Sequence, residues 1–154
     1  FSMVAERAGV QRHTLYAHFP DEMSLHLACA GLFHEQNPMP DPAPWRAIAD
    51  PDERLRTGLK EVYDWYERNA DLLGAVLRDV ELHEPTKAVM VLHVAPVLEA
   101  YRNVLGNGLG ARQRALLHLA LDFHTWRTLT QDSGLKNAAA VQTMAKAIEC
   151  GAES

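Results

Sequence analysis

The proline-rich segment from Asn37 to Pro44 constrains the fold more than any other part of this chain. It holds four prolines in eight residues. Proline lacks a backbone N–H donor and clashes with the preceding helical turn, so no helix can run through this segment. We therefore predict a linker or domain boundary here, with a short N-terminal part before it and a longer part after it.

Apolar residues on both sides of this segment recur at helical spacing, and no strand pattern stands out. Asp50, Pro51 and Glu53 form a helix-start signature, and Pro96 should kink a long helix. The sequence predicts an all-α protein. We expect helices over residues 2–8, 11–19, from 22 onward, 51–68, 72–80, 86–105, 112–131 and 137–149.

The composition is that of an ordinary globular chain, with 47% apolar and 23% charged residues. We expect no apolar run long enough to span a bilayer, and no signal-peptide pattern opens the sequence. We therefore expect a cytoplasmic protein without membrane contact. Cys29 and Cys150 lack a CxxC partner, so we expect both to stay reduced.

The segment from Val4 to Pro20 combines a short helix, a tight turn at Gly9 and a second short helix. This is the layout of a helix-turn-helix, whose second helix enters the DNA major groove. The inner side would be apolar, formed by Val4, Ala5, Ala8, Val10, Leu15 and Phe19.

This segment resembles the signature of the TetR family of transcriptional regulators. The matching residues are Val4-Ala5, Ala8-Gly9-Val10 and the run from Thr14 to Phe19. A less specific similarity covers residues 62–66, 76–79 and 121–129. The resemblance implies a helix-turn-helix DNA-binding domain over residues 1–40 and a helical-bundle domain for ligand binding and dimerisation over 41–154. The family's first helix precedes Val4, so we expect the DNA-binding domain to be incomplete in this sequence.

The family match also assigns DNA-contacting positions, with Arg12 the best candidate to pair with a guanine. The expected set is Gln11, Arg12, His13, Thr14, Tyr16 and His18. The chain departs from the family at Glu22, where a lysine usually reaches a phosphate. The net charge of −5 and the scarcity of Arg and Lys before residue 37 also differ from a general nucleic-acid binder.

Within the bundle domain, we expect a pocket with aromatic walls and a few polar groups, suited to a small apolar or aromatic effector. The plausible lining residues are Val62, Trp65, Tyr66, Leu77, Met90, His93, Val97, His118 and Phe123. The predicted 112–131 helix is apolar around much of its circumference, so it needs partners on two sides. We expect a homodimer interface formed by Leu116, Leu119, Trp126, Val141, Met144 and Ile148; the alternative is that these residues belong to the monomer core.

The resulting hypothesis is a homodimeric repressor that binds a pseudo-palindromic double-stranded DNA operator and is released by its effector. The alternative is a helical module that binds a small molecule or a protein and has lost DNA binding. No metal-ligand, nucleophile or phosphate-loop motif was found, so we expect no enzyme activity, no metal and no cofactor.

Overall fold

The computed structural model describes residues 2–151, and all regular secondary structure in that range is helical. The all-α prediction is therefore confirmed. The helices are α1 (Ser2–Ala8), α2 (Arg12–His18), α3 (Glu22–Gln36), α4 (Pro51–Arg68), α5 (Ala70–Asp79), α6 (Glu84–Val89), α7 (Ala95–Leu105), α8 (Ala111–Ala120), α9 (Phe123–Arg127) and α10 (Asn137–Cys150), with the short turns η1 (Pro44–Ala47), η2 (Met90–Val94) and η3 (Thr128–Asp132).

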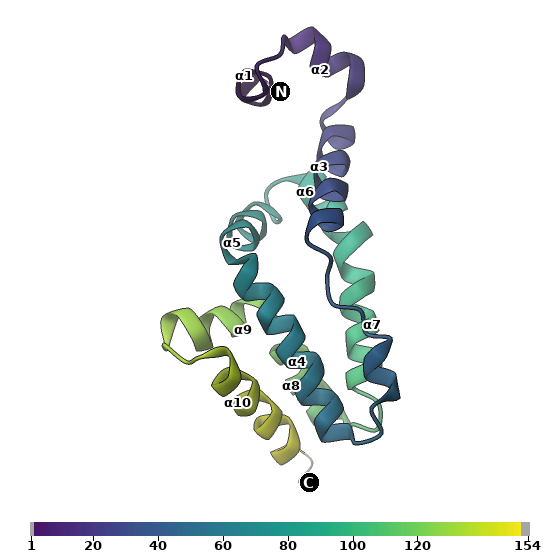
Figure 1. Cartoon of the computed structure of the whole chain (residues 1–154), viewed down its shortest axis with the longest axis vertical. Coiled ribbons are helices and arrows are strands. Elements are labelled where there is room, and N and C mark those ends of the chain that lie inside the picture. The colour runs from purple at the N-terminus through teal and green to yellow at the C-terminus, as the bar shows by residue number, and fades with distance from the viewer. Residues whose placement is uncertain (1, 152–154) are drawn as a thin grey trace.

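Helices α1 and α2 lie at one end of the molecule, apart from the main body (Figure 1). Gly9 joins them with a φ of +66°, a left-handed conformation that glycine adopts without steric cost. Ala5 and Leu15 face each other and are buried together with Leu25 of α3, while Phe19 packs against the three. This small apolar cluster is separate from the main core.

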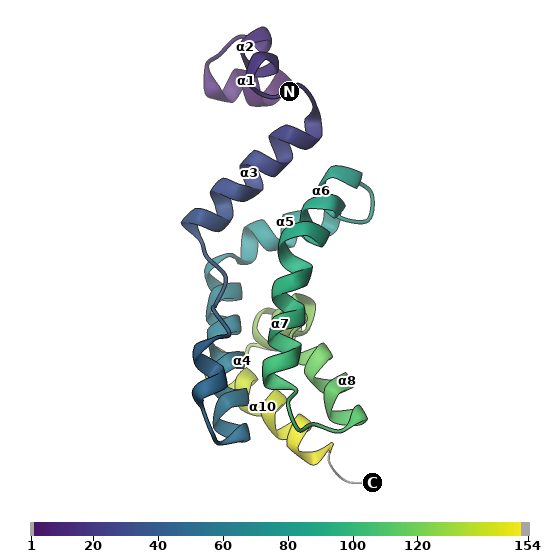
Figure 2. The same cartoon turned by 90° about the vertical axis from the view of Figure 1, so that its right-hand side faces the viewer.

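Helix α3 connects this end of the molecule to the main body (Figure 2). Its first turn is fixed by a capping box, in which Asp21 Oδ1 accepts a 2.7 Å hydrogen bond from the backbone N–H of Ser24. Leu25 belongs to the small N-terminal cluster, whereas Phe33 near the last turn packs against the main core. One rigid helix therefore contributes to both apolar clusters.

The proline-rich segment breaks the helix as predicted, but it is packed against the body and is not a free spacer. The Asn37 carbonyl accepts a 3.2 Å hydrogen bond from Trp65 Nε1, and the Pro40 carbonyl accepts a 2.6 Å bond from the Tyr101 hydroxyl. Trp45 in η1 is completely buried. This segment therefore forms part of the wall of the bundle.

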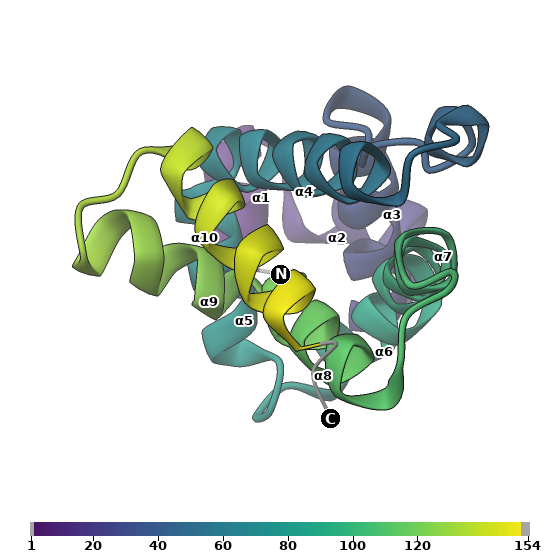
Figure 3. The same ribbon diagram turned by 90° about the horizontal axis from the view of Figure 1, so that it is seen from below.

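Helix α4 runs along one side of the main body, where it packs against α7, α9 and α10 (Figure 3). Asp50 caps its first turn through bonds from the N–H groups of Asp52 and Glu53, as the sequence predicts. Two of its buried tyrosines form hydrogen bonds with the C-terminal end of α8. The Tyr63 hydroxyl donates to the Ala120 carbonyl at 3.0 Å, and the Tyr66 hydroxyl donates to the Leu121 carbonyl at 2.6 Å.

Helices α6 and α7 are continuous through η2, a π-helical turn in which the Ala95 N–H donates to the Met90 carbonyl. The wider turn lies directly before Pro96, which has no N–H to offer. The combined helix Glu84–Leu105 is long and apolar enough to cross a membrane by length and composition alone. This corrects the expectation that no apolar stretch reaches that length. Four apolar residues of this helix instead line an internal cavity: Val89, Met90, Val94 and Leu98.

The single helix predicted over residues 112–131 is wrong. The chain breaks at Leu121 and Asp122 and continues as α9 in a new direction. The Asp122 carboxylate accepts hydrogen bonds from the N–H groups of His124 and Thr125, so it caps a new helix. Because α8 and α9 point different ways, their apolar residues reach the core from two directions without requiring a second chain.

Candidate functional site

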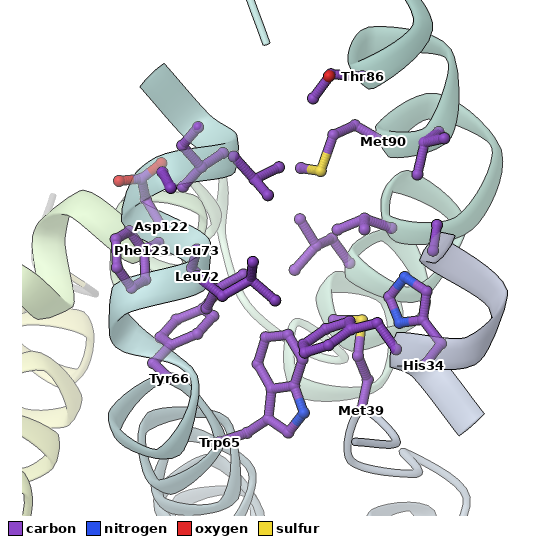
Figure 4. A pocket seen from close by; sticks show the side chains of 18 of the residues that line it. His34, Met39, Trp65, Tyr66, Leu72, Leu73, Thr86, Met90, Asp122 and Phe123 are labelled. Carbon is purple, nitrogen blue, oxygen red and sulfur yellow. The ribbon is translucent and has the colours of Figure 1, made fainter. Parts of the chain in front are cut away.

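A cavity of about 410 Å³ lies in the main body between two walls of side chains (Figure 4). One wall comes from α3 and the helix from α6 to α7, and it includes His34, Thr86 and Met90. The other comes from α4, α5 and the start of α9, and it includes Trp65 and Tyr66. This volume lies in the range of small-molecule pockets.

Aromatic rings form the floor of the cavity, and their polar atoms are already engaged. Trp65 Nε1 donates to the Asn37 carbonyl and the Tyr66 hydroxyl to the Leu121 carbonyl. Burial first, and then the nearby carboxylate of Asp122, raises the pKa of the Tyr66 phenol well above its ordinary value. Tyr66 therefore stays neutral, and it offers a ligand the face of its ring.

Two charged residues at the cavity wall, Arg102 and Asp122, have hydrogen-bond partners, and Asp79 is a third charged residue of the lining. Arg102 donates two hydrogen bonds to Glu99, at 3.0 and 2.8 Å, and Asp122 accepts the two bonds that cap α9. Most of the remaining lining is apolar: Ala30, Phe33, Met39, Leu72, Leu73, Ala75, Val76, Leu77, Val89, Met90, Val94, Leu98, Leu121 and Phe123. A ligand would therefore be recognised mainly by shape and apolar contact.

His34 is the polar side chain that is best placed to tune this cavity. Its ring centroid lies 5.8 Å from that of His93. Partial burial lowers the pKa of His34 below the ordinary value of 6.5, and the neighbouring His93 lowers it further. At neutral pH the imidazole of His34 is therefore uncharged, in keeping with an apolar cavity.

This lowered pKa predicts that acidification destabilises the fold. The unfolded chain binds more protons than the folded chain between pH 6.5 and the lower folded pKa of His34. The stability gained by keeping His34 neutral is complete above pH 6.5 and is lost as the pH falls through the folded value. His34→Gln should reduce the fall in unfolding free energy between about pH 7.5 and about pH 5.5, measured by urea denaturation.

The effect should be small, because the side chain is partly exposed and solvent screens its interaction with His93. His13→Gln is the control, since it removes an exposed histidine on α2 that does not line the cavity. An unchanged pH dependence in His34→Gln would contradict the assignment.

Six of the nine side chains predicted to line a pocket do so: Trp65, Tyr66, Leu77, Met90, His118 and Phe123. The other three do not line it. Val62 is buried in the core with 1% of its surface exposed, and Val97 packs against that core. His93 lies beside His34 without lining the cavity. Helical spacing gives the apolar side of a helix but cannot separate core positions from cavity positions on that side.

Sequence reasoning missed the contribution of α3 to the cavity. His26, Cys29, Ala30, Phe33 and His34 all line it. Their i, i+3, i+4, i+7 and i+8 spacing marks one side of a helix, but the predicted boundary places residues 1–40 in the DNA-binding domain. That side in fact faces the main body across the proposed domain boundary at residue 40.

The predicted DNA-contacting residues lie on or beside α2, at the end of the molecule away from the body (Figure 1). Arg12, His13, Tyr16 and His18 have exposed side chains, as does Gln11 at the N-cap, and Thr14 is half-buried. Leu15 on the opposite side of the helix is buried. Helix α2 therefore presents a polar side to solvent, and DNA contact by that side stays a prediction.

Four of the six predicted dimer-interface residues are covered by the chain itself. Trp126, Val141, Met144 and Ile148 are each at most 6% exposed and belong to the main core. Leu116 is half-buried against the same core, whereas Leu119 is 51% exposed. As placed here, only Leu119 of these six offers a large apolar surface to a second chain, and dimerisation remains a prediction.

A cluster of possible metal ligands lies where α3 approaches the start of α6. Glu22, His26 and His83 each direct one ligand atom to a common point, with these atoms within 4.8 Å of one another. We predicted no metal site because the chain holds no metal-ligand motif, and His83 lies far from Glu22 and His26 in the sequence. The available signal was the i, i+4 spacing of Glu22 and His26, which places both on one side of a helix.

Comparisons with protein-family models, with curated proteins and with solved structures found no match to this chain. The similarity to the TetR signature therefore rests on the residues of α1 and α2.

Proposed function

We propose that this protein is a ligand-responsive DNA-binding transcriptional regulator, most simply a repressor that a small apolar or aromatic effector releases from its operator. The observation that carries the proposal is the position of α3. Its first half packs against α1 and α2, and its second half lines the cavity. A ligand in the cavity would therefore contact the same helix, α3, that packs against α2.

The TetR-like run from Thr14 to Phe19 supports DNA binding at the α2 end. The exposed Arg12 side chain is suited to pair with a guanine, because its guanidinium matches the O6 and N7 acceptors in the major groove. Tyr16 and His18 are exposed on the same helix and suit phosphate contacts. Two copies of this unit in a homodimer would read the two halves of a pseudo-palindromic operator.

The cavity supports an apolar effector, because most of its lining is apolar, its floor is aromatic, and Arg102 and Asp122 already have partners. An effector that holds α3 in a different position moves Leu25, and with it the packing of Leu15 in α2. The spacing of two α2 helices in a dimer would then no longer match successive major grooves. Such a ligand shifts the equilibrium only if it binds the two positions of α3 with different affinity.

Selection from a library of random double-stranded DNA tests the proposal directly. We expect enrichment of a pseudo-palindromic site whose affinity falls as salt rises. Arg12→Ala should weaken binding to that site by about 1–3 kcal/mol and relax the preference at one base pair in each half-site. Arg46→Ala is the matched control, because Arg46 is an exposed arginine in η1, outside the helices proposed to contact DNA.

Equal losses in both arginine variants, or no enriched sequence at low salt, would contradict DNA recognition by α2.

The second candidate function is a helical module that binds a small molecule without DNA. It is favoured by Glu22, which stands where the TetR family usually has a phosphate-binding lysine. The Glu22 carboxylate points to the main body, where it contacts His83 at 3.3 Å. Ligand binding in the cavity without any DNA preference would identify this module.

A further inference from the structure

Glu22, His26 and His83 come from two separate elements and meet at one point. Glu22 and His26 lie one turn apart on α3, and His83 caps the start of α6. Glu22 Oε1 lies 3.3 Å from His83 Nε2 and 3.9 Å from His26 Nε2. The two imidazole ring centroids are 4.9 Å apart.

These separations suit a metal ion of the size of Zn²⁺. Ligand atoms about 2.0–2.1 Å from a tetrahedral Zn²⁺ are about 3.4 Å from one another. The Glu22 to His83 separation already matches that value, the Glu22 to His26 separation exceeds it by a fraction of an ångström, and the two histidine ligand atoms lie within 4.8 Å of each other. Side-chain rotation is enough to close the remainder, because all three side chains are at least 35% exposed.

His83 has a neighbour that can hold its ring in a metal-binding orientation. Its Nδ1 lies 2.8 Å from Thr86 Oγ1 and accepts from the Thr86 backbone N–H at 3.3 Å. When Nε2 binds a metal, the proton of the neutral ring lies on Nδ1 and is donated to Thr86 Oγ1. A metal-binding histidine characteristically donates its other ring N–H in this way. Without metal, Nδ1 is unprotonated and caps α6 by accepting from the Thr86 N–H. Metal binding at Nε2 would favour the other tautomer, in which Nδ1 carries the proton.

We propose that Glu22, His26 and His83 form a Zn²⁺-binding site that joins α3 to α6. Two imidazoles and one carboxylate favour zinc and similar transition metals over Mg²⁺ and Ca²⁺, which prefer oxygen ligands alone. The exposure of the cluster leaves room for water to complete the coordination. The site also explains why a carboxylate stands at position 22, where the helix cap of α3 would accept many other residues.

Zinc at this site would restrict the motion of α3 relative to the main body. His26 and Thr86 also line the cavity, so the metal lies at its edge. With α3 held to the start of α6 by three bonds, the first half of α3 could no longer separate from α6. This inference does not rest on the proposed DNA-binding function, because metal binding is measured without DNA or effector.

The test uses tag-free protein titrated with Co²⁺, followed by its visible d–d absorption, and with Zn²⁺ followed by calorimetry. We expect one equivalent of metal and a Co²⁺ band that Zn²⁺ abolishes and Mg²⁺ does not. Glu22→Gln and His83→Ala should each weaken Zn²⁺ binding by more than about tenfold, since loss of an outer hydrogen-bond partner alone costs about 10–100-fold. Thr86→Val should weaken it by about tenfold for the same reason.

Matched controls are Glu35→Gln, an exposed glutamate at the other end of α3, and His13→Ala, an exposed histidine on α2. Both should bind Zn²⁺ as the unmodified chain does. Circular dichroism would check that each variant folds. If His83→Ala does not fold, Glu22→Gln decides, because it retains the shape of an exposed side chain. No binding, or binding that is unchanged in Glu22→Gln, would overturn the proposal.

Discussion

Replacing Trp45 with alanine is expected to lower the free energy of unfolding by about 3–5 kcal/mol. Trp45 is completely buried, although it lies just after the proline-rich segment. Its ring lies 5.0 Å from that of Tyr101, and its Nε1 donates a 3.0 Å hydrogen bond to Glu61. The substitution leaves a cavity in the core and removes the hydrogen bond to the exposed carboxylate of Glu61.

Urea denaturation followed by far-UV circular dichroism measures this loss without relying on the removed fluorophore. Trp45→Phe should cost less, because it keeps an aromatic ring against Tyr101. Leu82→Ala is the control, since that apolar side chain is 91% exposed and its removal should change stability by less than about 0.5 kcal/mol. A loss below about 1 kcal/mol for Trp45→Ala would show that this segment is not part of the core.

Replacing Ala30 with tryptophan is expected to weaken binding of an apolar probe in the cavity by more than about tenfold, or about 1.4 kcal/mol. Ala30 lies on α3 and lines the cavity, so an indole at this position would occupy space that a ligand needs. In a cavity of about 410 Å³, the added indole would reduce the space left for an aromatic ligand. Titration with N-phenyl-1-naphthylamine, whose fluorescence rises in apolar surroundings, measures the affinity.

Ala28→Trp provides a closely matched control, because it makes the same change on the same helix at an exposed position that does not line the cavity. It should leave the affinity for the probe unchanged. Equal affinity in the two variants would mean that the probe binds elsewhere. A loss in Ala30→Trp alone would place ligand binding beside α3, the helix that also packs against α2.

Local interactions were predictable from the sequence because they depend on residues close together in the chain. The cap of α4 at Asp50 and the turn at Gly9 both follow from short-range hydrogen bonding and backbone sterics. The proline-rich break follows from the missing N–H groups. Helical periodicity likewise identified five of the aromatic and apolar residues of the cavity wall: Trp65, Tyr66, Leu77, Met90 and Phe123.

The division between α8 and α9 was not predictable from the same signals. Residues 112–131 are apolar on several sides, which fits either one helix with two partners or two helices with different directions. The buried hydroxyls of Tyr63 and Tyr66 bind the carbonyls of Ala120 and Leu121, where α8 ends. These bonds come from more than fifty residues earlier in the chain, so no local pattern reveals them.

The sequence by itself determined most of the helices, the cap of α4 and the polar side of α2, because each depends on neighbours within one or two turns. Only the tertiary structure decided that α3 lines the cavity and that His83 meets Glu22. Both depend on how α3 packs against α6, across the proline-rich segment and the whole of α4 and α5. Side-chain periodicity gives a helix its apolar and polar sides, but the partner of each side is set by the packing of the entire chain.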